Sequence, residues 1–90
     1  MSNMMIKNFH GELVPFPTQV SLSSSLSLEA KGFYITLLML SPEERTIGNA
    51  LEYTKEGPNF LHRYMDELEK NNLISTDGNL IELLDAEEVR

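Results

Sequence analysis

The sequence predicts a mainly α-helical domain with one small β-hairpin, which is an α+β fold. Three stretches of helical periodicity follow one another, and each begins at a residue suited to start a helix, namely Ser27, Thr46 and Pro58. Two short apolar runs then flank Asp77 and Gly78, a pair favoured in tight hairpin turns. The 90 residues suffice for one core and leave no room for a second.

The N-terminal part of the chain has no sustained period. We expect residues 1–15 to form an arm, either mobile or pairing as a short strand, and Pro15 and Pro17 favour an extended path. Residues 18–22 alternate between polar and apolar, which predicts a short strand with Val20 and Leu22 on one face.

The first helix is predicted over residues 28–40. The Ser27 hydroxyl can accept from the amides of the first turn, and Glu29 suits the positive end of the helix dipole. Nine of these thirteen residues are apolar or aromatic, which is wider than one core-facing stripe. The helix is therefore either central to the fold or in contact with a second copy in a homodimer.

Two further helices and the hairpin complete the predicted fold. Thr46 can cap a helix over residues 47–54, and Pro58 suits the first position of a helix over residues 58–70, because its missing amide would be unpaired there anyway. A stripe of apolar residues marks the buried side of the last helix: Leu61, Tyr64, Met65 and Leu68. Asn71 and Asn72 are a plausible left-handed stop. Residues 73–75 and 80–83 form the hairpin, and residues 85–90 are an acidic tail.

Composition narrows the function classes. Seven basic against fourteen acidic residues give a net charge of −7, which is unusual for a protein that neutralises phosphates. Zero cysteines exclude a disulfide scaffold, a thiolate zinc site and a thiol nucleophile. The first eleven residues lack the pattern of a secretory signal, and the apolar run over residues 33–40 is short of the roughly 20 residues that span a bilayer. We therefore expect a cytoplasmic protein without a membrane segment.

Two stretches resemble winged helix-turn-helix domains of phage and plasmid replication initiators and related regulators of Gram-positive bacteria. Residues 26–38, LSLEAKGFYITLL, are similar to the opening of the first helix in that group. Residues 64–74, YMDELEKNNLI, are similar to the end of the recognition helix, where Asn72 replaces the usual glycine. The resemblance covers about residues 16–84 and implies a winged helix-turn-helix domain there.

The resemblance also implies where DNA would bind. The third helix would enter the major groove and the hairpin would be the wing. The residues that would face DNA by position are Lys55, Asn59, Phe60, His62, Arg63 and Asn79. The charge pattern departs from this expectation, because Arg63 and Lys55 are the basic residues well placed on this surface and Asp77 lies at the wing tip.

No constellation of residues predicts an enzyme, a cofactor or a metal site. His62 and Asp66 are four residues apart and could share a metal, but the other histidine, His10, lies in the arm, so a solvated surface pair is favoured. The resemblance therefore implies a small non-enzymatic protein that binds double-stranded DNA in transcription or replication, of phage or mobile-element type. The alternative is an acidic winged-helix module that binds a protein. Phe60 is either part of the core or an exposed aromatic contact.

Overall fold

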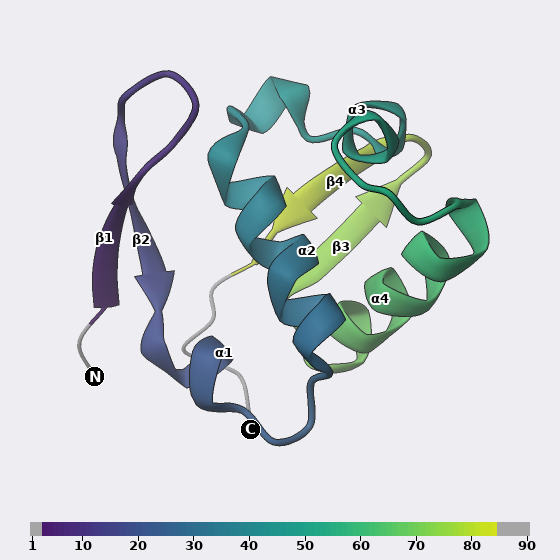
Figure 1. Cartoon of the computed structure of the whole chain (residues 1–90), viewed down its shortest axis with the longest axis horizontal. Coiled ribbons are helices and arrows are strands. Elements are labelled where there is room, and N and C mark those ends of the chain that lie inside the picture. The colour runs from purple at the N-terminus through teal and green to yellow at the C-terminus, as the bar shows by residue number, and fades with distance from the viewer. Residues whose placement is uncertain (1–2, 85–90) are drawn as a thin grey trace.

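The computed structural model describes residues 3–84 of the chain. It is a small α+β domain in which short helices pack with two separate antiparallel hairpins (Figure 1). In chain order the elements are β1 (Asn3–Lys7), β2 (Leu13–Pro17), α1 (Thr18–Leu22), α2 (Leu28–Met39), the 3-10 turn η1 (Pro42–Glu44), α3 (Ile47–Glu52), α4 (Pro58–Lys70), β3 (Ile74–Asp77) and β4 (Leu80–Leu83). The acidic tail predicted over residues 85–90 lies outside the described residues.

The N-terminal segment is a hairpin whose strands β1 and β2 pair from Asn3 with Pro17 to Lys7 with Leu13. Asn8 is buried in the connecting loop, where its Oδ1 accepts from the amides of His10 and Glu12 at 2.9 Å each. The Phe9 amide donates to the Met39 carbonyl at 2.8 Å, which ties the loop to the end of α2. Of the two alternatives for this segment, the structure shows the paired strand.

Residues 18–22 are helical, so the predicted strand is wrong. The described pairing register of β2 ends where Pro17 meets Asn3, and within residues 3–84 a strand beyond it would have no partner for its backbone groups. One turn of helix, α1, pairs those groups within the segment itself. Val20 is fully buried while Leu22 is 81% exposed, so the apolar alternation did not mark a sheet face.

Helix α2 is central to the fold. Its cap is the predicted one, since the Ser27 hydroxyl accepts from the Ala30 amide at 3.1 Å. The N-terminal hairpin lies on one side of α2 and α4 with β3 and β4 on the other (Figure 1). Phe16 of β2 reaches the ring of Tyr34 at a centroid distance of 6.1 Å. Packing within one chain thus accounts for the buried apolar residues of α2, while Leu28 and Ile35 stay exposed.

The C-terminal half follows the predicted order of elements. The Thr46 hydroxyl accepts from the Asn49 amide at 3.1 Å, and Pro58 is the first residue of α4. Asn72 has a φ of 59°, the left-handed conformation expected at that stop. Between the strands, Gly78 has a φ of 61°, which glycine adopts without strain. An isolated antiparallel bridge joins Thr46 to Leu80 and holds the hairpin against the start of α3.

One core lies between α2, α4 and the two hairpins. Its largest fully buried side chains come from α1, α2, α4, the connection before β3, and the two strands of the C-terminal hairpin: Val20, Leu37, Leu61, Leu68, Leu73, Ile74 and Ile81. Among residues 3–84, no helix combines the length and the apolar character needed to cross a membrane.

Candidate nucleic-acid interface

Helix α4 presents a polar face to solvent along its first two turns. Gly57 is the N-cap, and Leu61, Met65 and Leu68 fix the buried side of the helix in the core. The helical period then turns Asn59, His62 and Arg63 outward, and all three are exposed. These residues are three of the six predicted to face DNA, and the structure brings them together on one surface.

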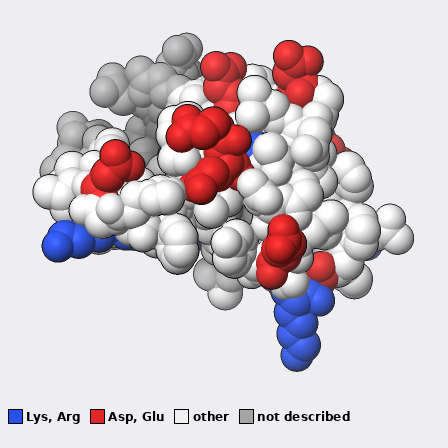
Figure 2. Space-filling model, turned by 90° about the horizontal axis from the view of Figure 1, so that it is seen from above, with Lys and Arg blue, Asp and Glu red and all other residues white. Residues whose placement is uncertain are grey.

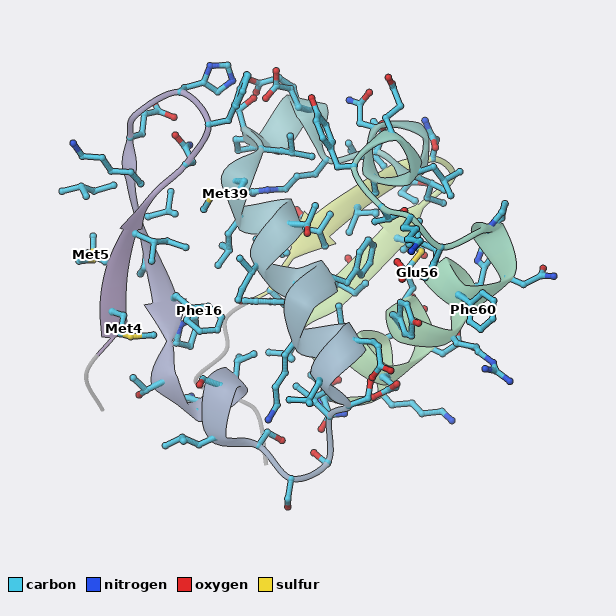
Figure 3. All side chains as sticks on the ribbon, in the orientation of Figure 1. Met4, Met5, Phe16, Met39, Glu56 and Phe60 are labelled. Atoms are coloured by element: carbon cyan, nitrogen blue, oxygen red, sulfur yellow. The ribbon has the colours of Figure 1, made fainter. Side chains whose placement is uncertain are left out.

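Of the two alternatives for Phe60, core or exposed aromatic, the structure shows the exposed one. The side chain is 48% exposed and points away from the body of the domain (Figure 3). The guanidinium carbon of Arg63 lies 5.6 Å from the centre of the Phe60 ring, within range of a cation–π contact. This contact holds the charge of Arg63 beside an apolar surface.

The other two predicted residues lie at the margins of this face. Lys55 is exposed in the loop between α3 and α4. Asn79 lies at the turn of the C-terminal hairpin and is engaged with α3, because its Oδ1 accepts from the Gly48 amide at 3.3 Å and its carbonyl accepts from the Ile47 amide at 2.9 Å. The side chain of Asn79 therefore helps to dock the hairpin on α3.

Basic groups are sparse around this face. Lys31 donates to the Ser21 carbonyl at 2.9 Å, and Arg45 donates from Nε to the Leu37 carbonyl at 2.8 Å, so both serve the fold. Burial lowers the pKa of the Arg45 guanidinium.

On the described part of α4 and the loop before it, the basic residues are Lys55, Arg63 and Lys70. Seen from above, over the loop after β1, η1 and α3, the molecule shows scattered carboxylates and its basic groups mostly at the margins (Figure 2).

A shallow depression of about 520 Å³ runs from α4 to the start of α2. Phe60, Arg63 and Lys70 line it together with Glu67. Glu67 does not serve as a partner of Arg63, because its two carboxylate oxygens accept from the Ser27 amide and the Ser27 hydroxyl at 2.8 Å each. The sequence revealed the capping role of Ser27 but not this second role in joining α2 to α4.

A second polar contact lies away from α4 and was not predicted. His10 Nε2 lies 2.9 Å from Glu44 Oε1, which joins the N-terminal loop to η1. The hydrogen bond and the charge of Glu44 raise the pKa of His10, and the same hydrogen bond leads the causes that lower the pKa of Glu44 to about 2. The two residues are 34 positions apart, so no local spacing could have indicated the contact.

His62 and Asp66 are both exposed on α4. Within residues 3–84, no group of three or more His, Asp or Glu side chains is gathered closely enough to hold a metal ion.

Comparison of the chain with family models, with curated proteins and with solved structures finds no match. The function is therefore inferred from the geometry of the surface.

Proposed function

We propose that this chain is a non-enzymatic winged helix-turn-helix protein that binds double-stranded DNA through the first half of α4. The observation that carries the proposal is the exposed polar face of α4, where Asn59, His62 and Arg63 stand clear of the core. The order of α3, loop, α4 and hairpin supports it, as does the bridge from Thr46 to Leu80, which adds a third short stretch beside the proposed wing.

The side chains on α4 suit direct reading of bases. Arginine and asparagine form paired hydrogen bonds with guanine and adenine in the major groove, and Arg63 and Asn59 lie one helical turn apart. Phe60 would offer an apolar surface to a thymine methyl group. Lys55, in the loop before the helix, and the backbone near Asn79, at the proposed wing tip, are the groups that would approach phosphates.

The charge distribution predicts weak binding with a shallow salt dependence. Each phosphate contact adds about 0.9 to the logarithmic salt slope, so Lys55, Arg63 and Lys70 together would give a slope of no more than about 3.

A homodimer through α2 would double the number of contacts with DNA. The large apolar residues that α2 exposes are Leu28, at 82%, and Ile35, at 39%, and equilibrium sedimentation at micromolar concentration tests whether they join two copies.

The decisive experiment is a titration with random duplex DNA at several salt concentrations, using Arg63→Glu and Lys7→Glu. Lys7 is exposed on β1, so its variant has the same change in net charge without altering α4. We expect Arg63→Glu to abolish binding and Lys7→Glu to weaken it only slightly. Equal losses in both variants would mean that binding follows net charge alone, and no binding by the unaltered protein at low salt would end the DNA proposal.

A second candidate function is binding of a protein partner, which exposed aromatic side chains favour. Tyr53 is 62% exposed and Phe60 is 48% exposed, while the chain carries a net charge of −7. Failure of the DNA titration, together with loss of a captured partner on Phe60→Ala, would favour this function.

In the DNA proposal, the resemblance implies a role in transcription regulation or as a replication accessory protein of a phage or mobile element.

A further inference from the structure

A groove of about 310 Å³ separates α2 from α4 and from the loop that follows α3. Its floor is apolar, because Phe33 and Leu61 line it and are both buried. Gly32 of α2 borders open space, since a Cβ atom built at this position meets no atom within 4 Å. A long side chain from outside could therefore lie along the floor.

The walls of the groove are aromatic and its charged groups are mainly acidic. Tyr53 and Tyr64 line it from the loop and from α4. Glu29 comes from α2 and Glu56 from the loop after α3. Figure 3 shows Glu56 between α2 and α4. Lys55 is the basic residue in the lining, and within residues 3–84 it forms no ion pair with either carboxylate.

The carboxylates of Glu29 and Glu56 affect the pKa of a side chain that lines the groove, Tyr64. Desolvation raises the pKa of the Tyr64 phenol, and the negative charges of Glu29 and Glu56 raise it further, while Arg63 opposes them. A cation placed beside this phenol would therefore be favoured by both carboxylates. The groove combines an apolar floor, two aromatic rings and a pair of negative charges.

We infer that this groove binds an arginine side chain from a basic segment of a partner protein. Arginine matches each part of the lining: its aliphatic stem suits the floor of Phe33 and Leu61, and its planar guanidinium stacks on tyrosine rings. The same guanidinium donates hydrogen bonds to carboxylates such as Glu29 and Glu56. The net charge of −7 on the chain favours approach of a basic segment.

This inference goes beyond the proposed DNA binding and is independent of it. The α4 residues in the groove are Leu61 and Tyr64, and neither belongs to the face proposed for DNA. Lys55 is common to both surfaces, where it has opposite effects. It would attract phosphate but would compete with an incoming guanidinium for Glu29 and Glu56.

The test uses two blocked pentapeptides of glycine and serine that carry either one central arginine or one central citrulline. Citrulline has nearly the shape of arginine without its charge. The amide signals of Gly32, Thr36 and Thr54 are followed by NMR during titration of the full chain. We expect saturable shifts at these residues with the arginine peptide at millimolar concentration, and at least about fivefold weaker binding of the citrulline peptide, as the loss of a charged hydrogen-bonded pair implies.

Variants separate the parts of the inference. Glu29→Gln and Glu56→Gln should each weaken arginine binding about two- to fivefold, as expected for charge pairs of exposed residues. Gly32→Leu fills the groove and should abolish binding, whereas Gly32→Ala adds one methyl group and should retain it. Lys55→Gln should strengthen arginine binding and weaken DNA binding, so failure of either proposal is seen separately.

Several outcomes would overturn the inference. Equal binding of the citrulline peptide would mean that charge is not recognised. Shifts confined to other acidic surfaces, such as η1, would place the arginine elsewhere. Unchanged arginine binding by a Gly32→Leu variant whose circular dichroism spectrum is native would show that the groove is not the site, and the absence of any saturable shift would remove the inference altogether.

Discussion

Helices α2 and α4 are nearly equal in length, with 12 and 13 residues, but the fold uses them differently. The N-terminal hairpin and α4 cover α2 from two sides, so five of its side chains are buried: Ala30, Phe33, Tyr34, Leu37 and Leu38. Helix α4 has one buried stripe of three residues and leaves its opposite side in solvent. The difference favours α4 over α2 for the proposed DNA contact, because a helix packed on two sides has fewer polar side chains left to enter a groove of DNA.

The largest expected effect comes from truncating leucines in the two buried surfaces. Leu37→Ala on α2 and Leu68→Ala on α4 should each lower the free energy of unfolding by about 2–5 kcal/mol, since both side chains are fully buried and a cavity would remain. Urea unfolding followed by circular dichroism measures this. The matched control is Leu28→Ala, at the exposed start of α2.

Leu28 is 82% exposed, so its truncation should change the free energy of unfolding by less than about 0.5 kcal/mol. A loss at Leu28 as large as at Leu37 would contradict the comparison. It would mean that the outer side of α2 is covered in solution, as in a homodimer.

Local chemistry explains which parts of this fold the sequence could predict. Ser27, Thr46 and Pro58 begin helices because their capping or missing-amide chemistry acts within one turn. Asn72 and Gly78 adopt positive φ where the sequence predicted a stop and a tight turn. These residues depend on their immediate neighbours, so a single sequence is enough to interpret them.

Features that depend on distant segments were less predictable. The helical state of residues 18–22 follows from the end of the β1 register, and the exposure of Phe60 follows from how α4 rotates onto α2. On the candidate interface, the exposed face of α4 followed from periodicity, whereas the engagement of Asn79 with Gly48 did not. The groove beside Gly32 requires α2, the loop after α3 and α4 to be placed together, and no spacing in the sequence indicates that.

A smaller effect should follow from cutting the polar link between the two helices. Ser27→Ala removes the cap on the Ala30 amide and the hydroxyl donor to Glu67, so the free energy of unfolding should fall by about 1–3 kcal/mol. Urea unfolding measures the loss. Ser24→Ala is the control, because Ser24 is exposed in the preceding turn and should be neutral. Equal behaviour of the two variants would show that the Ser27 hydroxyl contributes nothing to stability, as a cap or as a donor to Glu67.

Truncation on the open side of α4 should affect stability less. Phe60→Ala removes a side chain that is half exposed and its contact with Arg63, so we expect a loss below about 1 kcal/mol. Thermal unfolding gives the comparison with Leu68→Ala on the same helix. A loss approaching that of Leu68→Ala would place the Phe60 ring in the core and would remove it from both proposed recognition roles.

The smallest expected effect is a pH dependence at the contact that fastens the N-terminal hairpin beside α2. Glu44, with smaller contributions from Glu12 and Glu43, raises the pKa of His10 above its ordinary 6.5, so the stabilisation by charged His10 is fully present below 6.5 and is lost as pH rises through the folded value. The pKa of Glu44 falls from 4.5 to about 2, so its contribution is present above 4.5 and is lost as pH falls toward 2. The contact should therefore stabilise the fold most between about pH 4.5 and about pH 6.5.

Melting temperatures of the unaltered protein and of His10→Gln, measured from about pH 5 to about pH 8, should converge as the pH rises. A difference that stays constant over this range would show that the charge of His10 has no part in holding the hairpin against η1.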